Sequence, residues 1–148
     1  MSLTLVDPIV PAHPDWTALV AEADALIELE PTLAELVGSY FPHDGTFAGA
    51  LCHLLADSLQ APAVKKDVLN KLFQDVVAAD PSIPQAALLD LQAVRARDPS
   101  CPSYLHAFLN LKGFQALQAH RFAHYLWSVD RDEMAVWLSN RVSVVIGA

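Results

Sequence analysis

The sequence has little glycine or cysteine, and no Lys or Arg in its first 64 positions. It contains 5 Gly and 2 Cys among 148 residues, and all 9 Lys and Arg residues lie between Lys65 and Arg141. Cys52 and Cys101 are too few for a disulfide framework or a zinc pattern, so reduced thiols are expected. Neighbours on a helix point about 100° apart, so Cys52 and His53 should not form a nucleophile pair. No glycine-rich phosphate loop is present, which excludes a nucleotide site of that kind.

Charge is unevenly divided along the chain, whose formal net charge is −8 at pH 7. Residues 1–64 hold about half of the 17 acidic residues and no Lys or Arg that could offset them. Nucleic acid and anionic membranes both select a basic surface, so neither is expected as a partner. We interpret the acidic half as a surface that keeps the domain in solution.

A leader pattern and long apolar runs are also missing. No stretch approaches the ~20 apolar residues that span a bilayer. Pro8, Pro11 and Pro14 interrupt the start of the chain, where no basic segment precedes an apolar one. We therefore expect a soluble, cytoplasmic protein with a proline-containing arm over residues 1–13 and one domain over residues 14–148.

Helical periodicity dominates what is present. Hydrophobic residues make up 53% of the chain, and they recur three, four and seven positions apart between prolines. Asp44 or Thr46 is placed to cap one of these helices. Helices are predicted over about 14–28, 31–40, 47–59, 64–78, 82–96, 103–128 (with a break near Lys112-Gly113) and 131–143. The expected fold class is all-α, a compact domain of six to eight helices, in which only Val142–Ile146 resembles a strand.

Two histidines stand at a spacing that zinc can use. His120 and His124 lie four residues apart, which places both on one face of a helix. The glutamate of a metalloprotease motif is replaced by Arg121 and Phe122, and no carboxylate follows closely enough to be a third ligand. Trp127 shares this face, which favours aromatic packing. We predict packing histidines and no metal site.

Polar residues interrupt the apolar faces of the last two helices. Gln118 and Arg121 lie among aromatic residues, and Arg141 lies on an equally apolar face. Either they form hydrogen bonds between helices of one domain, or they mark a subunit interface. Trp127 and Trp137 on the same helices suggest contact with a partner or a further domain, so a self-associating, dimeric domain is expected.

Asp98 stands where the fifth helix is expected to end, with Pro99 after it and Arg95 and Arg97 before it. A carboxylate there can cap the helix or pair with an arginine, which is the commoner role. It can also hold a ligand, because Pro99 restricts the backbone and nearby positive charge keeps the carboxylate ionised. The position alone favours the structural role.

Two runs carry a resemblance to a known family. Leu89–Pro99 contains Asp-Leu-Gln-Ala-Val-Arg-Ala-Arg-Asp-Pro, which resembles the DLQAVxxRDP segment of serine acetyltransferases. Leu111–Arg121 is similar to their LKGFHALQAYR segment, and the likeness continues to Trp127. His120 is a departure, since the family often has Tyr there. On these motifs, residues 14–148 resemble the N-terminal helical domain of that family.

The resemblance implies a function that the pattern alone does not. The family transfers the acetyl group of acetyl-CoA to the hydroxyl of L-serine, and L-cysteine inhibits by competing for the serine site. The helical domain joins trimers into larger homo-oligomers, and a left-handed β-helix after it carries the catalytic His–Asp pair and the acetyl-CoA groove. Of the residues that contact substrate, only Asp98 and Pro99 map onto this chain, with Asp98 expected to hold the α-ammonium group.

The resemblance places no catalytic, cofactor-binding or metal-binding residue within the chain. We therefore expect the 148-residue chain to be inactive alone, with acetyl-CoA a co-substrate of the complete enzyme. The alternative is a free-standing, non-catalytic helical module that serves oligomerisation or interaction.

Overall fold

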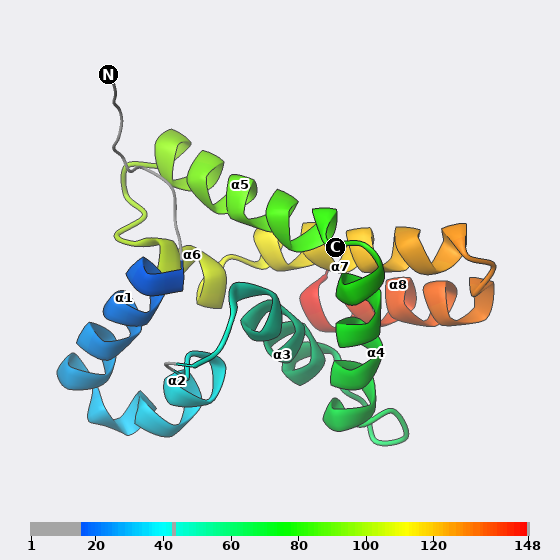
Figure 1. Ribbon diagram of the computed structural model, residues 1–148, viewed down its shortest axis with the longest axis horizontal. Coiled ribbons are helices and arrows are strands. Elements are labelled where there is room, and N and C mark those ends of the chain that lie inside the picture. The colour runs from blue at the N-terminus through cyan, green and yellow to red at the C-terminus, as the bar shows by residue number, and fades with distance from the viewer. Residues whose placement is uncertain (1–15, 43, 148) are drawn as a thin grey trace.

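Helices form nearly all of the regular structure of this domain (Figure 1). The computed structural model describes residues 16–42 and 44–147, so the predicted arm over residues 1–13 lies outside the described residues. The helices are α1 (Trp16–Leu29), the 3₁₀ turn η1 (Pro31–Leu33), α2 (Ala34–Tyr40), α3 (Phe47–Leu59), α4 (Lys66–Ala79), α5 (Ser82–Arg97), α6 (Tyr104–Asn110), α7 (Lys112–Ser128) and α8 (Asp132–Ile146). These elements confirm the all-α prediction, and the β pairing within the described ranges is one isolated bridge, between Ala61 and Val64.

Side-chain caps set the starts of α3 and α6. Thr46, rather than Asp44, caps α3, and its hydroxyl accepts a hydrogen bond from the Gly49 backbone N–H at 3.0 Å. Ser103 caps α6 in the same way at 2.9 Å. Pro31, predicted in the first turn of a helix, opens the 3₁₀ turn that precedes α2.

The long helix predicted over residues 103–128 is divided at Leu111. Its backbone is extended, with φ −85° and ψ 108°, so α6 ends there and α7 begins one residue later. The predicted break near Lys112-Gly113 is therefore confirmed to within about one residue.

The strand-like interpretation of Val142–Ile146 is wrong. α8 continues through Ile146, and both Val145 and Ile146 pack against the core as helical residues. The helix ends at Gly147, whose φ of 82° places it in the left-handed region and lets its N–H bond to the Ser143 carbonyl. A run of β-branched residues suits either element, and burial of one helical face decides between them.

Pairs of helices enclose one apolar core (Figure 1). α3 and α4 form a hairpin, α7 and α8 lie antiparallel, and α5 runs along α7. α1 and α2 lie at the opposite end of the molecule, against α6 and α3 respectively. Phe73 of α4 meets Phe122 of α7 with ring centroids 4.8 Å apart. This contact joins the hairpin to the antiparallel pair.

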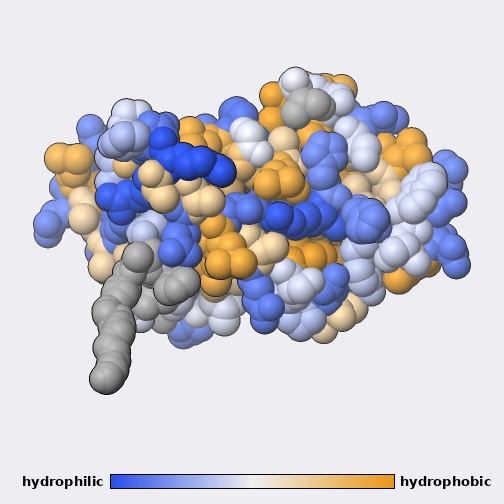
Figure 2. Space-filling model, turned by 90° about the horizontal axis from the view of Figure 1, so that it is seen from above, coloured by the Kyte–Doolittle hydropathy of each residue, from blue (hydrophilic) through white to orange (hydrophobic). Residues whose placement is uncertain are grey.

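The face that α5 covers mixes hydrophilic and hydrophobic residues (Figure 2). Large apolar side chains that remain exposed over the described surface are Leu29, Leu33, Leu36, Val68, Leu89, Leu117, Trp127, Val129, Val136 and Val144. Among the described helices, none combines the length and the apolar character needed to cross a membrane.

Candidate functional site

The end of α5 presents the carboxylate that the sequence singled out. α5 stops at Arg97, and Asp98 takes an extended conformation while its N–H still bonds to the Val94 carbonyl at 3.0 Å. Pro99 follows, and proline cannot donate the next helical hydrogen bond. The loop from Asp98 to Ser103 then leads to α6. Asp98 is thus an exposed side chain on a restricted backbone, as predicted.

The Asp98 carboxylate is oriented by Ser100. Its Oδ1 accepts the Ser100 backbone N–H at 3.1 Å and the Ser100 hydroxyl at 2.6 Å. These two bonds, the hydroxyl first, lower the pKa of Asp98 below its usual range, because both stabilise the charged form. The carboxylate is therefore ionised at neutral pH. Its other oxygen, Oδ2, has no hydrogen-bond partner among the described residues.

The arginines that the sequence placed beside Asp98 do not contact it. Arg95 lies over the ring of Tyr104, with its guanidinium carbon 4.9 Å from the ring centroid. Arg97 lines a groove between α5 and the junction of α6 and α7, together with Lys112. The expectation that these arginines keep Asp98 ionised is therefore wrong, because Ser100 has that role.

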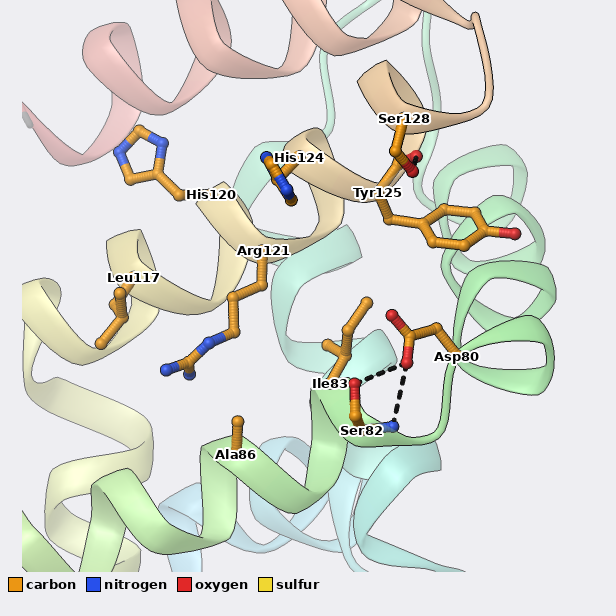
Figure 3. A pocket seen from close by; sticks show the side chains of 10 residues that line it. All are labelled: Asp80, Ser82, Ile83, Ala86, Leu117, His120, Arg121, His124, Tyr125 and Ser128. Atoms are coloured by element: carbon orange, nitrogen blue, oxygen red, sulfur yellow. Dashed lines mark hydrogen bonds between the residues drawn. The ribbon is translucent and has the colours of Figure 1, made fainter.

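The same turn occurs a second time in the chain. Asp80-Pro81-Ser82 repeats the order of Asp98-Pro99-Ser100, and Asp80 Oδ1 accepts the Ser82 N–H at 3.2 Å and its hydroxyl at 2.5 Å. Figure 3 shows this second turn at the start of α5. The turn geometry alone is therefore a structural feature of helix ends in this chain. A role in binding has to rest on something that Asp98 has and Asp80 lacks.

A polar network joins α5 to α7. Asp90 Oδ2 accepts hydrogen bonds from Gln118, at 2.7 Å, and from Arg121, and Arg121 also donates to Gln118 Oε1 at 2.9 Å. Gln118 is fully buried and Arg121 and Asp90 are about three-quarters buried. Sequence reasoning had left the roles of Gln118 and Arg121 open. The structure places them in bonding between helices, and it adds Asp90, which no local pattern selects.

Arg141 likewise bonds inside the domain. It donates to the carbonyls of Leu59, at 3.0 Å, and Gln60. These carbonyls stand at the end of α3, where a helix leaves acceptors without intrahelical partners. Arg141 therefore fastens α8 to the C-terminal end of α3.

The two histidines line an open hollow on the surface of α7. The hollow, about 460 Å³, lies between α7 and the start of α5. In Figure 3 Arg121 points toward α5, whereas His120 and His124 lie along another side of α7. Within residues 16–42 and 44–147 there is no group of three or more His, Cys, Asp or Glu side chains that could hold a metal ion. Trp127 is 55% exposed, so its predicted packing is only partial.

The side chains of Cys52 and His53 lie in different surroundings, as expected for neighbours on a helix. Cys52 is fully buried, and burial raises the pKa of its thiol to about 12. The His53 ring instead meets the Tyr40 ring edge-on, with centroids 4.8 Å apart. Burial, and then the charge of Lys66, lower the pKa of His53. A thiol in this state is not a nucleophile at neutral pH.

A larger hollow than the one beside the histidines lies at the other end of the molecule. It has a volume of about 830 Å³ and is bounded by α1, η1, α2, α3 and α6. Three leucines along it are exposed, and Leu29 is 77% exposed. A hollow of this kind is typical of an interaction surface.

Comparisons with known proteins give the class of protein that this fold and site define. The family model described as "Serine acetyltransferase, N-terminal" matches residues 16–119. The chain therefore belongs to the serine acetyltransferase family through this N-terminal domain. The match favours the acetyltransferase interpretation over a free-standing module.

Individual serine acetyltransferases match this chain in sequence and in fold over most of its length. The serine acetyltransferase of Salmonella typhimurium is 39% identical over 129 residues, which is 87% of this chain and 47% of that protein. The crystal structure of Neisseria gonorrhoeae serine acetyltransferase in complex with serine superposes with a TM-score of 0.88 at 31% identity, covering 91% of this chain and 56% of that one. A serine acetyltransferase in complex with cysteine gives 0.86 at 37% identity, over 89% and 51%. This chain spans about half the length of the relatives it matches.

Proposed function

We propose that this chain is the helical domain of a cytoplasmic enzyme that transfers an acetyl group from acetyl-CoA to the hydroxyl of L-serine. The product, O-acetylserine, serves cysteine synthesis. In this proposal Asp98, with Pro99, forms one side of the site that binds serine and the inhibitor L-cysteine. The family match over residues 16–119, which includes both residues, supports the assignment.

The observation that carries the site is the place of Asp98 in the segment that resembles the family's DLQAVxxRDP motif, a place that Asp80 does not have. The state of the Asp98 carboxylate fits the role. It is ionised and exposed, Ser100 fixes one oxygen, and the described residues leave the second oxygen open. An α-ammonium group offers three donors and a positive charge, and a carboxylate accepts from it at charge-assisted strength. The fixed oxygen holds the orientation of the open one before substrate arrives.

Asp98→Asn in the complete enzyme tests this role. The amide keeps the shape but removes the charge, so KM for serine should rise roughly 10- to 100-fold, with a similar loss of cysteine inhibition. The KM for acetyl-CoA should stay within about twofold, because no acetyl-CoA contact involves this residue in the proposal. Steady-state kinetics with each substrate varied in turn measure all three.

Asp80→Asn is the matched control, because it makes the same change in the same kind of turn. It should reproduce any structural effect of the amide without changing the KM for serine. If both variants lower thermal stability alike and both keep wild-type serine and cysteine affinities, Asp98 is a structural residue and the site assignment fails.

The remaining parts of the proposal concern the whole enzyme. The groups that bind acetyl-CoA and deprotonate serine are expected in the β-helix domain that the family resemblance implies, since a serine hydroxyl needs a positioned base. The 148-residue chain assayed alone should therefore release no CoA from acetyl-CoA and serine, and turnover by the pure chain would refute this. The helical domain is also proposed to join copies of the enzyme into a homo-oligomer.

A further inference from the structure

Both arginines that flank Asp98 in sequence lie away from its carboxylate. Arg95 belongs to the last turn of α5, and its guanidinium stacks over the ring of Tyr104. Tyr104 is the first residue of α6, on the far side of the loop that carries Asp98. The stacked pair therefore bridges the two ends of this loop. It also determines where the positive charge of Arg95 lies relative to Asp98.

Without that ring, Arg95 has an obvious alternative partner. It lies in the last turn of α5, and Asp98 is the C-cap residue of the same helix, so the long Arg95 side chain starts within one turn of the carboxylate. Arginine pairs with a carboxylate through two parallel hydrogen bonds, which would use the open Oδ2 as well as the charge. An ammonium ligand would then have to displace the guanidinium before it could bind. In the structure the described residues leave Oδ2 without a hydrogen bond, and Arg95 lies on Tyr104.

We propose that Tyr104 is a positioning residue that keeps Arg95 off the Asp98 carboxylate, so that this carboxylate stays open to the α-ammonium group of an amino-acid ligand. The inference rests on the proposed role of Asp98 and adds to it a residue that acts through Arg95. An aromatic face attracts a guanidinium without neutralising it. The Tyr104 ring therefore holds the Arg95 guanidinium near the site, but leaves the Asp98 carboxylate without an ion-pair partner among the described residues.

A double-substitution cycle in the complete enzyme separates this role from a structural one. Tyr104→Leu removes the aromatic face and frees Arg95 to pair with Asp98. It should raise KM for serine roughly 2- to 5-fold with kcat unchanged, a competition of the size expected for an exposed ion pair. Arg95→Gln alone should leave that KM near wild type. The pair Tyr104→Leu with Arg95→Gln should restore it, because the guanidinium of Arg95 is then removed, while Arg97 keeps its place in the groove beside Lys112.

Conservative variants of Tyr104 and a parallel assay of Asp98→Asn distinguish the role of Tyr104 from that of Asp98. Tyr104→Phe keeps the aromatic face and should behave as wild type; if Tyr104→Leu does not fold, Tyr104→Met takes its place in the cycle. An unchanged KM in the leucine or methionine variant overturns the inference, and so does a raised KM that Arg95→Gln fails to restore. Asp98→Asn is assayed alongside: if it leaves the serine KM at the wild-type value, the proposed function of Asp98 fails first. If it raises that KM while the cycle shows no rescue, only the role of Tyr104 fails.

Discussion

At the residue scale, Cys52 makes the stability of the domain depend on alkaline pH. Its thiol is fully buried in α3, and burial raises its pKa from 9.0 to about 12. The unfolded chain exposes the thiol, which then ionises near its ordinary value. Between these two pKa values the unfolded state loses the proton first, so rising pH favours unfolding. Burial and the hydrogen bond to Asp57 also raise the pKa of Tyr40, and this residue acts in the same direction.

The free energy of unfolding should therefore fall by about 1.4 kcal/mol for each pH unit above 9 through Cys52 alone. Cys52→Ala should cost roughly 1 kcal/mol at pH 7 through the small cavity, but give a shallower decline above pH 9. Urea denaturation at a series of pH values from 7 to 10.5 measures both effects. Parallel curves for the two proteins would show that the thiol does not ionise on unfolding as argued.

At the element scale, the Asp90 network determines how firmly α5 is held on α7. Asp90→Asn keeps the side-chain size but removes the charge that Arg121 faces, and leaves Arg121 partly buried without its counter-charge. Since both side chains are about a quarter exposed, the loss should be about 2 kcal/mol rather than that of a fully buried pair. Thermal or urea unfolding of the isolated domain measures it.

Asp75→Asn provides the matched comparison for this change. Asp75 pairs with Lys71 at 2.6 Å on one turn of α4, but both side chains are more than 60% exposed. An exposed pair of this kind contributes about 0–0.5 kcal/mol. Equal losses in the two variants would mean that the Asp90 network adds nothing beyond a surface ion pair.

The same network shows where sequence reasoning reaches its limit. Helix starts could be predicted from the sequence because their signals are local. The Thr46 side chain accepts a hydrogen bond from a residue three positions later, and a proline restricts the residues next to it. Asp90 instead meets partners 28 and 31 residues away, and no local pattern encodes that pairing. The position of Asp98 at the end of α5 was predictable for the local reason. The stacking of Arg95 on Tyr104 was not predictable, because it depends on how the loop between α5 and α6 brings Tyr104 back to the end of α5.

At the scale of the whole molecule, the hollow beside α1 and α2 is the surface best suited to join two copies. It contains three exposed leucines, Leu29, Leu33 and Leu36, around a volume of about 830 Å³. At the end of α7, Trp127 and Val136 line a smaller hollow of about 390 Å³. We therefore expect the domain to self-associate through this hollow at high micromolar concentration. Sedimentation velocity across a concentration series measures it.

Two substitutions locate the association. Leu36→Glu places a charge in the hollow and should shift the domain toward monomer, because a charge is costly to bury in an apolar contact. Trp127→Gln alters the other end of the molecule and should leave the distribution unchanged. A wild-type domain that sediments as a monomer throughout excludes self-association, and sensitivity to Trp127→Gln alone moves the interface to α7 and α8.

The bonds from Arg141 to the end of α3 have a consequence for biosynthesis. The carbonyls of Leu59 and Gln60 accept hydrogen bonds from Arg141, which is translated 82 and 81 residues after them. Until Arg141 has been added to the chain, these two carbonyls can accept hydrogen bonds only from water. The α3–α4 hairpin can form during this time, but it cannot reach its final packing. Co-translational folding of the domain is therefore completed late, only after α8 has left the exit tunnel, although most of its helices emerge long before.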